Sequence, residues 1–301
     1  MKKNILVAGA TGHLGSMICK ALTGQGANVI ALVRKESDAG KIESLAKAGA
    51  TVVGVDFNKN VEIAKACEGI DCVVSALAGL AEVIIDTQSA LLDGAISAGV
   101  KRFIPSDFCT DYQPLTPGEN RNFDLRRTFK GYIDEKDIQA TSIFNGAFAD
   151  ILKYNTPILN LKNRSIAYWG DKADWKLDFT TMENTAAFTA AVALEDESPR
   201  DLHIASFQIS PNMMKESIKV ITEQDFNLQK LSDLDEFSAN IKKQRLENPS
   251  GEQELYAKWQ QAQYIYSMFT TQHPLLDNHH HNEIVWTSAD EYLRSFLKQV
   301  E

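Results

Sequence analysis

Residues 9–15 read Gly9-Ala10-Thr11-Gly12-His13-Leu14-Gly15, directly after the apolar run Asn4–Ala8 and before a segment with helical spacing of its apolar residues. Glycines in such a loop permit a tight turn, close approach of the backbone to a pyrophosphate, and close packing of helix on strand. The positive end of the helix favours phosphate. The context predicts a dinucleotide-binding loop rather than a turn that binds nothing. The residues expected to contact the cofactor are Gly9, Thr11, Gly12, His13, Leu14 and Gly15.

Outward from this loop, β-branched runs alternate with amphipathic helical segments. Strands are expected at Asn4–Ala8, Asn28–Val33, Thr51–Val55, Cys72–Ser75 and Arg102–Pro105, and helices at Leu14–Gln25, Lys41–Ala48, Asn60–Cys67 and Ala81–Ala98. Parallel strands cannot be joined by a hairpin, so helical crossovers between apolar strands imply a parallel sheet covered on both faces. We therefore expect a doubly wound, mostly parallel, Rossmann-like α/β domain over residues 1–155.

The second half is predicted to be mainly helical. After a charged helix at Asn122–Asp137 and a strand at Ala140–Asn145, short strands and turns occupy residues 157–176. Further helices are expected at Glu183–Leu194, Pro211–Glu223, Ser232–Leu246, Glu252–Phe269 and Ser288–Val300, the last opening with a capping box, Ser288-x-x-Glu291. Residues 156–301 are thus predicted to form a smaller, mostly helical substrate lobe, some segments of which return to the sheet.

Composition excludes several classes of protein. The 301 residues carry a net charge of −9, which gives no electrostatic support for binding nucleic acid. Four cysteines lack zinc-ligand or disulfide spacing, so we expect no metal and a reducing cytoplasm. The longest apolar stretch is too short to span a bilayer. The expected partner is a small-molecule substrate, not nucleic acid or a membrane, and self-association stays open.

The end of the second strand indicates which dinucleotide binds. An acid there bonds the ribose 2′-hydroxyl, whereas a cation accommodates a 2′-phosphate. Arg34 and Lys35 occupy this position, which favours NADP(H), although solvated cations at a strand end are the alternative. Further contacts are expected from Asp56 and Phe57 near the adenine, and from Ala76, Leu77 and Ala78 beneath the cofactor.

Several segments resemble the NmrA-like, isoflavone-reductase-like family of atypical short-chain dehydrogenases/reductases. They are the glycine loop, Leu32-Val33-Arg34, Arg102-Phe103-Ile104-Pro105-Ser106-Asp107-Phe108, the stretch Thr141–Phe148, and the stretch Phe179–Phe188 with Asn184 where an Asp is usual. The resemblance covers residues 1–210. It implies that Asn145 and Phe148 lie near the cofactor, and it makes Leu77, Phe108, Asn145, Gly146 and Phe148 candidate walls of a substrate pocket.

The same resemblance directs attention to one helix. Reductases of the group carry a lysine there, and an ungapped count from Thr141 places Arg126 at that position. Guanidinium is a poor proton donor, so Arg126 is expected to hold the nicotinamide ribose or to polarise a substrate oxygen, with Lys130 as the substitute cation. A surface arginine of the helix without a role at the site is the alternative. Two hypotheses follow: an NADP(H)-dependent reductase of a small aromatic or conjugated carbonyl-type substrate, or an NADP(H)-binding redox sensor without turnover.

Two other patterns are typical of functional sites, one of a catalytic pair and one of a metal site. Tyr132-x-x-x-Lys136 has the spacing of the Tyr/Lys pair of short-chain dehydrogenases, but Tyr132 lies about 9 Å along the helix from Arg126, so we interpret the spacing as coincidence. The run His279-His280-His281 suggests a metal site. Consecutive residues point in different directions, and a solvated loop is the preferred interpretation.

Overall fold

The computed structural model describes residues 2–273 and 275–297. The chain forms two compact units that interleave along the sequence. Unit 1 comprises residues 1–108, 123–144 and 185–202, and unit 2 comprises residues 109–122, 145–184 and 203–301. The boundary predicted from the sequence lies after residue 155, with some later segments returning to the sheet.

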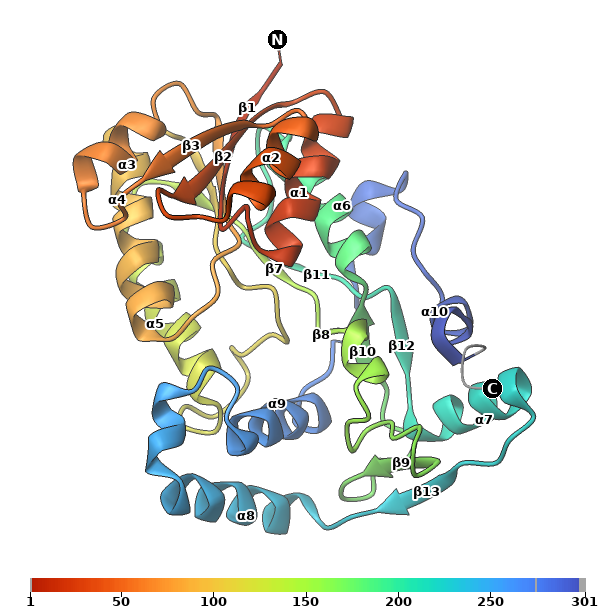
Figure 1. Cartoon of the computed structure of the whole chain (residues 1–301). Coiled ribbons are helices and arrows are strands. Elements are labelled where there is room, and N and C mark those ends of the chain that lie inside the picture. The colour runs from red at the N-terminus through yellow and green to blue at the C-terminus, as the bar shows by residue number, and fades with distance from the viewer. Residues whose placement is uncertain (1, 274, 298–301) are drawn as a thin grey trace. The chain divides into compact units, whose positions relative to one another are not determined.

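Unit 1 is built on one parallel sheet of six strands (Figure 1). The strands are β1 (Asn4–Ala8), β2 (Asn28–Arg34), β3 (Thr51–Val55), β4 (Cys72–Ser75), β5 (Arg102–Ile104) and β6 (Gln139–Ala140). Their order is β3-β2-β1-β4-β5-β6, and every neighbouring pair is parallel. The order reverses between β1 and β4, which confirms the doubly wound, Rossmann-like prediction.

Helices cover both faces of this sheet, as Figure 1 shows. They are α1 (His13–Gly24), α2 (Ala39–Lys47), α3 (Asn60–Ala66), α4 (Gln88–Ser97), α5 (Arg121–Asp134) and α6 (Met182–Ala193). Helices α3, α4 and α5 enclose a core in which the rings of Phe103 and Phe129 lie 6.3 Å apart, while α1 and α2 pack on the other face. Burial of apolar side chains on both faces explains why the strands are almost continuously hydrophobic.

Two predicted elements of unit 1 are interrupted. The helix expected at Ala81–Ala98 begins as a π-helical segment, η1 (Glu82–Thr87), and becomes regular only in α4. Side chains bond the carbonyls of this wide turn, since the Thr87 hydroxyl donates to Glu82 O at 2.8 Å and the Gln88 amide to Ile84 O at 3.0 Å. The strand expected at Ala140–Asn145 divides into β6 and β7 (Ser142–Phe144), and β7 pairs instead with β11 (Asp201–His203).

Unit 2 combines two small sheets with helices. Its strands are β8 (Ala147–Phe148), β9 (Ser165–Tyr168), β10 (Leu177–Thr180), β12 (Phe207–Ile209) and β13 (Asn227–Lys230). Its α-helices are α7 (Pro211–Thr222), α8 (Leu234–Glu247), α9 (Lys258–Thr270) and α10 (Ala289–Leu297), with short 3₁₀ segments η2 (Ala149–Lys153), η3 (Pro249–Gln253) and η4 (Asp277–His281). In the core, Trp169 stacks on Phe237 at 4.6 Å and meets Phe269 edge-on at 5.3 Å.

The start of α10 confirms the predicted capping box. The Ser288 N–H donates to Glu291 Oε2 at 2.8 Å, and the Glu291 N–H donates back to Ser288 Oγ at 3.3 Å. The predicted end of this helix, residues 298–300, lies outside the described residues. Among the helices that the structure describes, none is both long enough and apolar enough to cross a membrane.

Candidate nucleotide-binding site

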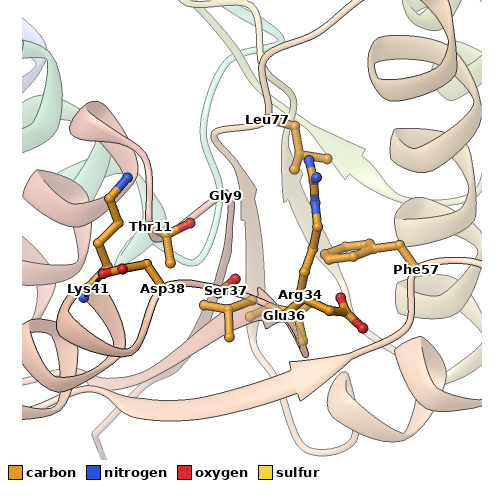
Figure 2. A pocket seen from close by; sticks show the side chains of 11 residues that line it. Gly9, Thr11, Arg34, Glu36, Ser37, Asp38, Lys41, Phe57 and Leu77 are labelled. Carbon is orange, nitrogen blue, oxygen red and sulfur yellow. Dashed lines mark hydrogen bonds between the residues drawn. The ribbon is translucent and has the colours of Figure 1, made fainter.

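A cavity of about 400 Å³ lies in unit 1 at the carboxyl ends of β1, β2, β3 and β4 (Figure 2). Its lining residues are Gly9, Thr11, Leu32, Val33, Arg34, Glu36, Ser37, Asp38, Lys41, Phe57 and Leu77. This edge includes the point where the strand order reverses, which is where open α/β sheets bind ligands. The structure therefore brings together five of the residues predicted to contact a cofactor, namely Gly9, Thr11, Arg34, Phe57 and Leu77.

The three glycines of the first loop have different structural roles. Gly9 adopts a φ of +76°, and a Cβ there would stand 2.5 Å from the carbonyl oxygen of Ala76. A Cβ on Gly15 would overlap the carbonyl of Gly9. At Gly12, which is exposed, the added atom would meet only Gly9 O at 3.2 Å. Gly9 and Gly15 are thus required by packing, whereas Gly12 keeps the space before α1 open.

The start of α1 suits an anion. Gly12 is the N-cap residue, so no side chain caps the helix, and the first turn contains no acid. The amides of this turn can therefore meet a phosphate without competition from a fixed carboxylate. His13 is exposed and Leu14 half-buried at this helix start, and neither lines the cavity.

Arg34 and Lys35 point to different places. In Figure 2 the Arg34 side chain extends through the cavity beside Phe57 toward Leu77. Lys35 does not line the cavity; its Nζ lies 2.7 Å from Glu62 Oε2. Successive residues of an extended strand face opposite sides, which explains the divergence. The hydrogen bond to Glu62 raises the pKa of Lys35, and the same bond lowers the pKa of Glu62 to about 2.

Lys41 supplies a second cation, which was not among the residues predicted from the sequence. It lies in the first turn of α2, lines the cavity, and donates its backbone N–H to Asp38 Oδ1 at 2.9 Å. A signal was present, because a helix was predicted to begin at Lys41, just beyond the end of the second strand. Glu36 and Asp38 also line the cavity, so its cations and acids are mixed.

The residues expected near the adenine and beneath the cofactor differ in whether they line the cavity. Asp56 holds a turn, since its Oδ1 accepts from the Asn58 N–H at 3.0 Å, and it does not line the cavity. Ala76 bonds β1 through its N–H, which donates to Ala8 O at 2.9 Å, and Ala78 is exposed. Of this group, Phe57 and Leu77 alone line the cavity.

Arg126 is fixed at the same edge of the sheet. Its Nε donates to the carbonyl oxygen of Ser106 at 3.0 Å, just beyond β5. The Ser106 hydroxyl in turn donates to the carbonyl of Leu77 at 2.6 Å, and Leu77 lines the cavity. Two hydrogen bonds therefore connect Arg126 to the cavity wall. A half-buried guanidinium held in this way is a fixed positive charge rather than a proton donor.

Lys130, the other cation proposed for catalysis, belongs to an ion-pair network. Its Nζ lies 2.6 Å from Asp134 Oδ2, and Arg200 bonds the other oxygen of Asp134 at 2.7 Å. Burial acts to raise the pKa of Asp134, but the hydrogen bonds from Lys130 and Arg200 outweigh it and lower the pKa. Lys130 is thereby engaged in joining α5 to the segment before β11.

Tyr132 and Lys136 are also engaged elsewhere. The Tyr132 hydroxyl donates to Asp93 on α4 at 2.8 Å, and Lys136 Nζ lies 3.6 Å from Asp93 and over the Tyr132 ring. None of the three lines the cavity. This grouping joins two helices, in agreement with the interpretation of Tyr132-x-x-x-Lys136 as coincidence.

Asn145 and Phe148 belong to unit 2. The buried Asn145 donates its N–H to Cys109 O at 3.1 Å and accepts the Thr180 hydroxyl at its carbonyl at 2.6 Å. Phe148 lies in β8, opposite Thr180 of β10. Gly146, between them, adopts a φ of +64°, and a Cβ added there would stand 2.5 Å from Asp178 O. Phe108 is buried in unit 1.

The sheet order, the glycine loop and the cavity at the reversal point define a protein of the Rossmann-like α/β class. This chain belongs to the NmrA-like family, whose model matches residues 1–223.

Known proteins resemble the chain over different lengths. A bifunctional pinoresinol-lariciresinol reductase of Linum usitatissimum is 29% identical over 64% of this chain and 65% of its own length. Pinoresinol reductase 1 of Arabidopsis thaliana is 26% identical over 98% of both. A structure of leucoanthocyanidin reductase with NADPH from Vitis vinifera is 20% identical, covers 98% of this chain and 99% of its own, and has a TM-score of 0.77, which supports the fold.

Proposed function

We propose that this chain is an NADP(H)-dependent reductase acting on a small aromatic or conjugated carbonyl-type substrate. The observation that carries the proposal is the cavity that joins the glycine loop to Arg34 and Lys41. Family membership and relatives named as reductases support it.

The cavity residues fit an NADP(H) molecule. Gly12 leaves room for a pyrophosphate at the uncapped start of α1, and Arg34 and Lys41 place two cations where a 2′-phosphate would lie. Phe57 offers a flat apolar surface for the adenine. When bound, the dinucleotide supplies the hydride, so the protein's own task is to bind, to orient and to stabilise charge.

Arg126 is the candidate for charge stabilisation. Its guanidinium is anchored through Ser106 to the loop that carries Leu77, and it stays charged at every physiological pH. A fixed cation can stabilise an oxyanion that develops as a carbonyl accepts hydride. The proton then comes from water or from the substrate, because arginine does not release one.

A second candidate function is a redox sensor that binds NADP(H) without turnover. The observation that favours it is the same Arg126 at the position of the lysine expected in reductases of this group. Both functions share the cavity, and the fold hosts either.

One assay separates them. Purified protein is mixed with NADPH and a panel of quinones, enals and aryl ketones, and the loss of NADPH absorbance is followed beside a binding titration. The reductase proposal expects turnover with at least one compound that exceeds the buffer rate. Tight NADPH binding with no turnover across the panel establishes the sensor instead, and absence of binding overturns both.

A further inference from the structure

A cluster of two histidines and one aspartate lies within unit 2, built from segments far apart in the sequence. Asp111 belongs to the loop beyond β5, His203 ends β11, and His273 follows α9. One ligand-type atom from each side chain lies within 4.8 Å of the other two. The two imidazole rings stack with centroids 4.0 Å apart.

Both rings approach the same oxygen atom. His203 Nε2 lies 3.0 Å from Asp111 Oδ2, and His273 Nε2 lies 3.9 Å from it. The other oxygen of Asp111 is already engaged, because Oδ1 accepts the Gln113 N–H at 2.8 Å. Asp111 is therefore oriented by its own loop so that Oδ2 faces the two ring nitrogens.

His273 offers a nitrogen that the protein does not use. Its Nε2 is buried and makes no hydrogen bond with the described residues. An imidazole nitrogen in that position keeps a lone pair available for a ligand. The side chains of Asp111, His203 and His273 are 9%, 21% and 16% exposed, so the cluster is mostly enclosed while an ion can still reach it.

A second carboxylate, that of Asp277, lies on the Nδ1 side of the His203 ring. Asp277 Oδ2 accepts the His203 backbone N–H at 2.8 Å and lies 3.7 Å from the ring Nδ1. Histidines that bind metals through one nitrogen usually have such a group near the other nitrogen. At 3.7 Å, Asp277 is an electrostatic neighbour of Nδ1 and not its hydrogen-bond acceptor. The arrangement turns Nε2 of His203 toward Asp111.

We propose that Asp111, His203 and His273 form a binding site for one divalent transition-metal ion, with Zn²⁺ as the reference ion. Ligands bonded to a tetrahedral zinc ion at about 2.0–2.1 Å lie about 3.3 Å from one another. The distances of 3.0 and 3.9 Å bracket this value, so small side-chain rotations admit the ion. Two imidazoles and one carboxylate suit zinc and its neighbours and leave a coordination position open.

The proposal departs from the expectation of no metal in the sequence analysis. No two of the three ligands stand within a motif-length spacing, so sequence patterns could not reveal them. The His279-His280-His281 run, which did attract attention, forms η4, where His281 Nδ1 lies 3.1 Å from Glu283 and the His279 side chain is exposed.

Metal titration of the whole protein tests the proposal. Chelator-treated protein is titrated with Zn²⁺ by calorimetry, and with Co²⁺ while its visible absorption is recorded. We expect one equivalent bound at micromolar concentration or tighter, with a cobalt spectrum of nitrogen and oxygen ligation. Wild-type protein that binds neither ion at that concentration overturns the proposal and leaves a hydrogen-bonded cluster only.

Variants locate the ion. His273→Gln removes a ring nitrogen that makes no hydrogen bond, so the fold should persist, which circular dichroism checks. Loss of a residue that merely supports a ligand lowers metal affinity by roughly 10- to 100-fold, so loss of this ligand should lower Zn²⁺ affinity by at least that factor. His203→Gln should do the same, and Asp277→Asn should weaken binding about 10-fold. His279→Gln is the matched control and should bind as wild type. Undiminished binding by His273→Gln, or loss confined to His279→Gln, overturns the assignment.

Discussion

The cavity of unit 1 and the polar contacts of unit 2 are assembled in opposite ways. The cavity is lined by residues at or just beyond the carboxyl ends of β1, β2, β3 and β4, together with Lys41 in the first turn of α2. The cluster of Asp111, His203 and His273 joins three distant segments. The residues of the cavity can therefore be located from local sequence, whereas those of the cluster come together only when the chain has folded.

The contrast has a physical basis. Parallel strands bring their carboxyl ends to one edge by topology alone, so a residue just beyond a strand has a predictable location. In unit 2 the contacts of the Asp111, His203 and His273 cluster are long-range, and no periodicity reveals which side chains meet. Substitutions in the cavity and in unit 2 can therefore separate the effect of local sequence from the effect of distant contacts.

The largest effect is expected at Gly12. In Gly12→Val the side chain occupies the open space before α1, where a pyrophosphate would lie, so NADPH and NADH binding should be abolished. Because an added Cβ meets only one atom, at 3.2 Å, the protein should remain folded. Calorimetric titration and a thermal melt measure the two properties.

Two comparisons sharpen this result. Gly131→Val, on α5 where an added Cβ meets nothing within 4 Å, should bind NADPH normally. Gly9→Val should fail to fold, since it combines a positive φ with a clash against Ala76. Retained binding by Gly12→Val would mean that the loop is merely a turn.

The sequence predicted most of unit 1 for these reasons. Strand boundaries at Asn4–Ala8, Thr51–Val55 and Cys72–Ser75 agree with the structure, because apolar runs between glycine-rich turns leave little choice. The π-helical start of α4 could not be predicted, since it depends on Thr87 and Gln88 bonding carbonyls. In unit 2, α9 begins only at Lys258 because η3 precedes it, whereas the apolar pattern from Glu252 suggested one helix.

The sequence predicted which residues lie at the strand ends of the candidate site, but not which way each side chain points. Arg34 lines the cavity, but its neighbour Lys35 pairs with Glu62, and the alternation of side chains along a strand would have separated the two. Lys41 required knowledge of how α2 is oriented. The hydrogen bonds that anchor Arg126 through Ser106 depend on tertiary structure alone.

The next effect concerns Arg126 and turnover. If the reductase proposal holds, Arg126→Ala should lower kcat by about 10²–10³-fold, the usual cost of deleting one donor to an oxyanion. The rate of wild type should show no ionisation near neutral pH that belongs to this residue, because guanidinium does not titrate there. Steady-state rates across pH with the best panel substrate provide the measurement.

Arg126→Lys is the informative partner variant. It keeps the positive charge and restores a group that can release a proton, so its rate should exceed that of Arg126→Ala and acquire a pH dependence. Equal rates for wild type and Arg126→Ala would remove Arg126 from catalysis. Lys130, held by Asp134, would then be the next residue to test.

A smaller effect is expected on the choice of dinucleotide. Arg34→Ala should reduce the preference for NADPH over NADH by about 10- to 150-fold, which corresponds to about 1.5–3 kcal/mol for a charge-assisted contact. Lys41→Ala should act in the same direction. Lys35→Ala is the matched control, because its ammonium pairs with Glu62 outside the cavity, and it should leave the preference unchanged. Dissociation constants for both dinucleotides decide the matter, and the reverse ranking of Arg34 and Lys35 would overturn the assignment.

The smallest effect tests the distant contacts of unit 2 at Asn184. Its Oδ1 accepts from the Thr287 N–H at 3.0 Å, and its Nδ2 donates to Val285 O at 2.9 Å, so one amide holds a segment about a hundred residues away. A carboxylate cannot donate to Val285, so Asn184→Asp should lower the free energy of unfolding by about 1–2 kcal/mol. The exposed Asn163→Asp is the matched control and should cost almost nothing.

The pH dependence of Asn184→Asp gives the sharper readout. The carboxyl would be buried facing the Val285 carbonyl, and we expect these two effects to outweigh the donors from Thr287 and Ser206 and to raise its pKa in the folded protein above the unfolded value. Its protonated form can donate as the amide does, so stability relative to wild type should recover as pH falls and be lost as pH rises through the folded pKa. Urea unfolding at several pH values measures this. If the loss in free energy of unfolding does not change with pH, the donor contact to Val285 contributes nothing. Apolar packing would then be what holds the C-terminal segment of unit 2 in place.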